Sequence, residues 1–169
     1  MVFGMSVATY TLIHVIISLI GIVSGLIVLF AMFGGKRLEG MTALFLVTTV
    51  LTSVTGFGFP FEHLLPSHIV GMISLVVLAI AILARYSLNL AGKWRAIYVI
   101  TAVMALYLNV FVLVVQSFLK VPVLHAMAPK GSEPPFLIAQ VVVMALFIVL
   151  GILAVKRFHP AQMSMAHAA

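Results

Sequence analysis

Long apolar runs separated by short polar segments dominate this sequence. Five such runs cover residues 7–33, 42–59, 68–86, 97–119 and 136–155. Runs of roughly 20 residues are long enough to cross a bilayer as helices. They lack the alternation of apolar and polar positions typical of barrel strands. Because lipid offers no partner to an unpaired backbone amide, we predict an all-α fold, a single domain of five transmembrane helices over residues 1–169.

The composition strengthens this prediction. The chain is 64% hydrophobic and 7% charged, with a mean hydropathy of +1.34, whereas soluble domains carry about 25% charged residues. The lipid bilayer is therefore the first predicted partner. The first run is too long for the h-region of a cleavable signal peptide and has no basic segment before it, so we interpret it as the first span.

The basic residues predict the direction of the chain. With the N-terminus outside, the outer loops contain only Lys120 and Lys130, and the other seven basic residues lie inside. This bias favours an external N-terminus and a cytoplasmic C-terminus. Arg85 is expected to extend its side chain to the cytoplasmic surface. Topology explains the net charge of +6, so no nucleic-acid partner is expected. The short loops favour a multi-pass protein of a bacterial inner membrane.

Several polar and small residues are predicted to face the bundle interior. Gly21 and Gly25 form a small-xxx-small pair that allows another helix to approach closely. A carboxamide facing lipid is unfavourable, so Asn109, Gln116 and Gln140 should point inward. Such residues serve either as helix-packing contacts or as the lining of a polar path.

Four histidines are predicted to gather near the outer face. His14 lies near the outer boundary of its span, and His68 begins the third span; His63 and His125 lie in outer loops, as does Glu62. Imidazole is a common metal ligand and the usual axial ligand of haem b. The cofactor candidates are therefore haem b, held by His14 and His68, or a transition metal.

Three interpretations of these histidines remain open. A metal site would draw further ligands from His63, His125 and Glu62. Histidine also favours the membrane interface without binding anything, and a quinone or proton-handling role is a third alternative. Only His14 lies within a span, whereas haem-bearing bundles usually carry histidines well inside their helices.

Other chemistry is excluded by what the sequence lacks. It has no Cys, and hence no disulfide or thiolate site. It has no Asp, and the carboxylates Glu39, Glu62 and Glu133 all lie outside the apolar runs, which counts against a proton relay. No phosphate-binding loop, metalloprotease motif or nucleophile elbow is present.

The stretch 105–136 contains LYLNVFVLVVQ, KVP and APKGSEPPF. It resembles small uncharacterised integral membrane proteins of proteobacteria. The resemblance covers the fourth span, the following loop and the start of the fifth span. It implies no activity and no catalytic residues. Within it, Ser132 is a candidate N-cap, and the two prolines that follow Glu133 are suited to the first turn of a helix.

The function predicted from the sequence is that of a small, non-enzymatic membrane protein. It would be an accessory or assembly partner of a membrane complex, bound to other subunits or to copies of itself. The alternatives are a redox protein that binds haem or metal through the outer histidines, and a small transporter or channel lined by the three carboxamides.

Overall fold

The computed structural model describes residues 4–59 and 66–160, and these form an all-helical bundle. Five of its helices are long and apolar enough to span a membrane, as predicted, and the described residues contain no strand. The elements are α1 (Val7–Phe33), α2 (Glu39–Gly56), α3 (Pro66–Ile82), the π-helical turn η1 (Leu83–Ser87), α4 (Lys93–Lys120), α5 (Pro122–Met127) and α6 (Pro134–Arg157).

The helix boundaries differ from the predicted ones mainly where polar residues continue a helix. α1 has the predicted limits, whereas α2 begins three residues earlier than predicted, at Glu39, and ends at Gly56. A carboxylate in the first turn suits the positive end of the helix dipole. The prediction of Ser132 as N-cap is wrong: Glu133 is the N-cap of α6, directly before two prolines. The short helix α5, with Pro122 in its first turn, was not predicted.

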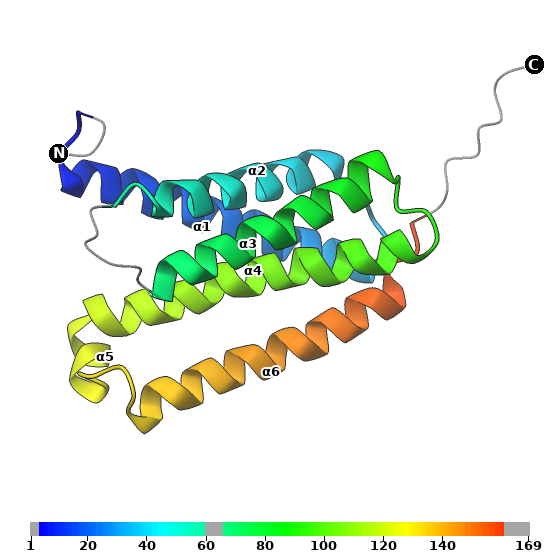
Figure 1. The fold of residues 1–169 in the computed structure, drawn as a ribbon. Coiled ribbons are helices and arrows are strands. Elements are labelled where there is room, and N and C mark those ends of the chain that lie inside the picture. The colour runs from blue at the N-terminus through cyan, green and yellow to red at the C-terminus, as the bar shows by residue number, and fades with distance from the viewer. Residues whose placement is uncertain (1–3, 60–65, 161–169) are drawn as a thin grey trace, which may run out of the picture.

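The helices form a chain of neighbours (Figure 1). α1 packs against α2, α2 against α3, and α3 against α4, while α6 lies along α4 and also contacts α1. α2 therefore stands between α1 and α3. We call the end where α2 and α4 begin the basic end. The opposite end, where α1 begins and α5 lies, is the histidine end.

The two halves of the bundle have different interiors. The apolar core lies mainly towards the basic end, where Met32, Phe45, Tyr98 and Leu106 are at most 2% exposed. Gly25 makes this packing possible, because a Cβ there would lie 2.7 Å from Leu106 and 2.8 Å from Phe45. The predicted role of the small-residue pair in close helix approach is confirmed.

Towards the histidine end, buried positions are more often polar. Ser53 of α2 donates a hydrogen bond to Ser74 of α3 at 3.1 Å. The carbonyl of Thr49, one turn earlier in α2, is an alternative acceptor for the same hydroxyl hydrogen at 3.0 Å. Burying a hydroxyl of this kind in a helix interface costs little free energy. When no neighbouring helix offers an acceptor, the hydroxyl can donate to a backbone carbonyl of its own helix.

Candidate functional site

His14 is held in one orientation by the end of α2. Its Nδ1 lies 2.8 Å from the Thr55 hydroxyl oxygen, and its ring meets that of Phe59 edge-on at 5.2 Å. The Thr55 hydroxyl donates to the carbonyl of Leu51 at 2.7 Å, so its single hydrogen is already used. This pattern assigns Nδ1 of His14 as the donor and leaves Nε2 with a lone pair.

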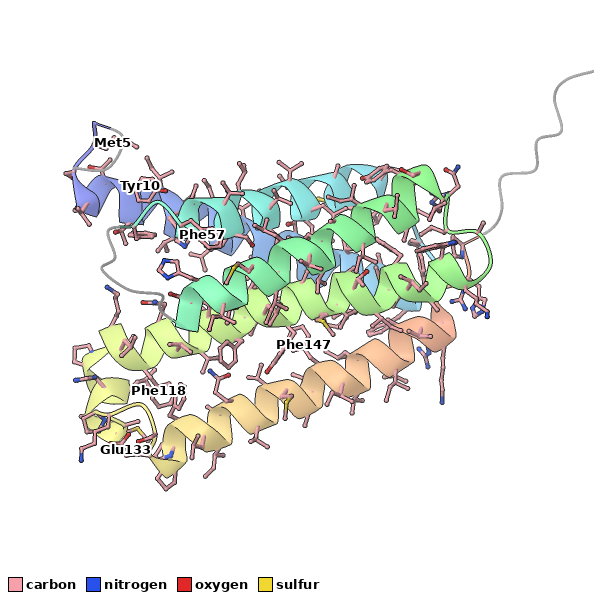
Figure 2. The ribbon with its side chains drawn as sticks, viewed as in Figure 1. Met5, Tyr10, Phe57, Phe118, Glu133 and Phe147 are labelled. Atoms are coloured by element: carbon pink, nitrogen blue, oxygen red, sulfur yellow. The ribbon has the colours of Figure 1, made fainter. Side chains whose placement is uncertain are left out.

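A tyrosine supports the same corner. The hydroxyl of Tyr10 donates to the Thr55 carbonyl at 2.7 Å, and its ring contacts Phe59 at 5.0 Å. Figure 2 shows Tyr10 on α1 at the histidine end. Sequence reasoning missed Tyr10, although its position one turn before His14 places both side chains on the same face of the helix.

His68 occupies the other side of the α2 terminus. It is only 3% exposed, and its ring stacks on that of Phe57 with centroids 5.7 Å apart. Gly71, one turn further along α3, lets the Phe57 ring approach, since a Cβ there would lie 3.2 Å from its Cζ. His14 and His68 thus lie at the same end of the bundle, each against the last turn of α2 or the residues just after it.

Of the remaining metal-ligand candidates, His125 lies within the described residues. His63 and Glu62 lie outside the described residues. His125 is exposed on α5. Within residues 4–59 and 66–160, no three His, Asp or Glu side chains lie close enough together to hold a metal ion.

Two of the three predicted interior carboxamides are buried. Asn109 is 8% exposed and packs against Gly21 of α1. A Cβ added to Gly21 would lie 3.2 Å from Nδ2 of Asn109. The same hypothetical Cβ would lie 3.2 Å from the hydroxyls of Thr48 and Thr49. Gln140, 9% exposed, donates to the Phe111 carbonyl at 3.3 Å. Asn109 thus faces α1 and α2, and Gln140 joins α6 to α4.

The expectation that Gln116 faces the interior is wrong, because its side chain is exposed. It lies about one turn from the end of α4 at Lys120. Water and headgroups near that end can satisfy a carboxamide that would be costly at the bilayer centre. The three carboxamides therefore do not line one continuous path in the described structure.

The expectation that Arg85 extends to the surface is also wrong. Its side chain is 1% exposed and is the largest of the fully buried side chains. Its Nη2 donates to Glu39 Oε2 at 2.8 Å and to the Arg37 carbonyl at 3.0 Å. The guanidinium also lies 5.2 Å from the ring centroid of Tyr98. A carboxylate, a carbonyl and an aromatic ring replace the water that the cation gives up.

Comparison with protein-family models, curated proteins and solved structures finds no match for this chain. The fold and the contacts described above are therefore the basis for any functional proposal.

Proposed function

We propose that this protein is a small, non-enzymatic accessory or assembly subunit of a membrane complex, placed in a bacterial inner membrane. The observation that supports this proposal is the sparse packing of α6. Its most apolar window is 11% buried, against 33–39% in the other four spans. α6 buries only Gln140, Phe147 and Ala154, which lie seven residues apart. Figure 2 shows Phe147 between α4 and α6.

The rest of α6 offers a long apolar face. Val141 and Ile148 are 58% and 55% exposed and lie two turns apart, about 100° around the helix from the buried residues. Buried residues at a spacing of seven form one narrow stripe of the α6 surface, which packs against α4 and α1 and leaves the rest of the helix surface open to a further helix. A transmembrane helix of a partner subunit, or α6 of a second copy, would complete this packing.

A photo-crosslinking residue placed at Val141 or Ile148 tests the proposal in the native membrane. We expect a discrete protein adduct of one mass at both positions, and the same partner in a fixed ratio after purification. Ile16 and Val23 of α1 are the matched controls, since they are also seven apart and are 48% and 57% exposed. An adduct of twice the protomer mass would identify the second copy as the partner. Lipid adducts alone at α6, as at the control positions, would refute the proposal.

The proposed orientation places the N-terminus and the histidine end outside and the C-terminus in the cytoplasm. This orientation is supported by the basic residues. Seven of the nine lie at the basic end of the bundle, among them Lys36, Lys93 and Lys156. A reporter fused after Ala169 should be active only on the cytoplasmic side. Labelling of Lys93 and Lys120 from the same compartment would contradict the arrangement.

A redox function based on haem or a metal is the second candidate. It is favoured by the hydrogen bond from His14 Nδ1 to Thr55, because metal-binding histidines usually donate one nitrogen to an acceptor and bind through the other. Nε2 of His14 would be the ligand atom and His68 the second axial candidate. Haem b would supply one-electron chemistry, and the chain would orient its ligand.

An absorption spectrum with elemental analysis of the gently solubilised protein tests this candidate. A Soret band, or a metal present at one equivalent, should be lost in His14→Ala. Thr55→Val should leave the ligand in place but weaken its binding about 10-fold or more, as for other supports of ligating histidines. A colourless, metal-free protein would remove the candidate and leave the accessory proposal standing.

A further inference from the structure

A groove runs over the outside of the bundle between α2 and the joined α3–η1 segment. It encloses about 370 Å³, and its walls include Ala43, Val47, Val50, Leu51, Ile82 and Tyr86. A methylene group takes up about as much room as one molecule of liquid water, roughly 30 Å³. The groove can therefore hold an aliphatic chain of about a dozen carbons.

The groove faces away from the protein interior. Val47 and Leu51 on its α2 wall are 57% and 43% exposed, and Tyr86 is 48% exposed. The walls offer almost no polar surface, so the occupant must present an apolar chain to them. Because α2 and α3 are both candidate membrane spans, the apolar chains available along their outer surface are lipid acyl chains.

Positive charge surrounds the basic end of this groove. Arg85 lies with its guanidinium 5.8 Å from the ring centroid of Tyr86, the last residue of the groove wall. Glu39 is shared between Arg85, at 2.8 Å, and Arg37, at 3.0 Å. One carboxylate thus pairs with two guanidinium groups, and the exposed Lys36 is a third cation nearby in the sequence. This end of the groove keeps an excess of positive charge.

Hydrogen-bond donors at the same place have no acceptor. Nε and Nη1 of Arg85 are buried and make no hydrogen bond within the described residues, whereas Nε of Arg37 lies 3.0 Å from Glu39 Oε1. Buried polar groups in folded proteins are nearly always paired, so unpaired donors indicate a missing acceptor. Phosphate oxygens are among the strongest acceptors for arginine.

We propose that the groove and the cluster Lys36, Arg37 and Arg85 form a binding site for one anionic phospholipid. An acyl chain lies in the groove, and the phosphate lies against Arg37 and Lys36, with the charge of Arg85 behind them. Basic pockets between transmembrane helices bind anionic headgroups by the same combination of charge and depth. The site lies on α2 and α3, away from the exposed face of α6, and does not depend on a partner subunit.

Native mass spectrometry of the full chain in detergent tests the site. The probes are phosphatidylglycerol and phosphatidylcholine with identical chains. The wild-type protein should retain one phosphatidylglycerol at least tenfold more strongly than phosphatidylcholine. The double variant Lys36→Gln/Arg37→Gln should lose this preference. It should still fold, because Arg37 accepts from Arg85 through its backbone carbonyl, which the substitution keeps.

A second variant fills the groove. Ala43→Trp should reduce phosphatidylglycerol retention at least tenfold, because the indole occupies the space of the chain. Ala145→Trp on the exposed face of α6 and Lys120→Gln/Lys130→Gln at the histidine end are the matched controls, and both should retain the lipid as the wild type does. Helical circular dichroism and the elution volume should be unchanged in all four variants.

Three outcomes would overturn the proposal. Loss with the charge variant but not with Ala43→Trp would show general attraction to anionic surfaces. Equal loss of both lipids with Ala43→Trp alone would show an apolar groove without headgroup selection. Displacement of phosphatidylglycerol by an excess of inorganic phosphate would show an anion site to which the acyl chain contributes nothing.

Discussion

The two halves of this bundle are held together by different kinds of contact between helices. The half near the basic end has a dense apolar core that includes Phe45 and Leu106, closed by the Arg85–Glu39 ion pair. The half near the histidine end contains neutral polar contacts such as Ser53–Ser74 and His14–Thr55. An ion pair is thus found where many side chains enclose it, and neutral hydrogen bonds join the helices at the other end.

The largest expected effect is at Arg85. Arg85→Ala removes the largest fully buried side chain and should lower the free energy of unfolding by about 3 kcal/mol, within the range for large-to-small core substitutions. Arg85→Met keeps most of the volume and should cost less than about 1.5 kcal/mol, because apolar replacements of buried ion pairs are often nearly neutral. Thermal unfolding in detergent measures both. Equal losses would show that the charge, and not the packing, stabilises this end.

A pair of glycines tests the difference in packing between the halves. Gly25→Ala would place a Cβ 2.7 Å from Leu106 and should destabilise by about 2 kcal/mol. Gly71→Ala would meet only the edge of the Phe57 ring at 3.2 Å. That strain is offset by the better helix propensity of Ala, so we expect a change within about 0.5 kcal/mol of zero. The same unfolding assay compares them, and a reversed order would mean that the histidine half is the tighter one.

The hydrogen bond between His14 and Thr55 should contribute less to stability than Arg85 or the close packing at Gly25. Thr55→Val removes the acceptor and should cost about 1 kcal/mol or less, as interhelical hydrogen bonds in membranes do. Nitrogen NMR of the His14 ring should report the Nδ1–H form in the wild type and a shift towards the Nε2–H form in Thr55→Val. Thr11→Val is the control, because the Thr11 hydroxyl bonds only to its own helix at Val7. An unchanged His14 spectrum in Thr55→Val would contradict the assigned tautomer.

The smallest expected effect is a local pH dependence at Glu133. Desolvation favours the protonated carboxyl, but backbone amides of Lys130 and Ser132 donate to the carboxylate at 3.0 Å and hold its pKa below the ordinary value of 4.5. A lowered pKa means that these bonds stabilise the loop at neutral pH and are lost as the pH falls through that lowered pKa. The amide proton shifts of Lys130 and Ser132 should titrate below pH 4.5 in the wild type. They should not titrate in Glu133→Gln; a midpoint above 4.5 would reject the contact.

Much of the fold was predictable because lipid imposes one strong rule on the backbone. Apolar runs long enough to span had to be helices, and α1 has the predicted limits of Val7 and Phe33. The small helix α5 was not predictable, since six residues after Pro122 carry no periodic signal. The inward position of Asn109 followed from the cost of exposing a carboxamide, but the same rule was wrong for Gln116, near a helix end.

The candidate site was predictable only in part. The predicted topology of the spans placed His14 and His68 at the same end of the bundle, but it could not show that α2 stands between them. The position of Arg85 was mispredicted because the partner that keeps it inside, Glu39, is 46 residues away in the sequence. Such long-range pairing depends on how helices are placed against each other, which no local pattern reports.

The wide turn η1 has a consequence for the length of the third span. Leu88 donates to the carbonyl five residues earlier, at Leu83, so the segment contains more residues than an α-helix of the same rise. Each residue advances an α-helix by about 100°. Removing one residue from the regular α-helical part of α3, Pro66–Ile82, would therefore turn η1 by that angle and carry the Arg85 guanidinium away from the Glu39 carboxylate. The number of residues before Arg85, and not only their identity, therefore determines whether its side chain faces Glu39.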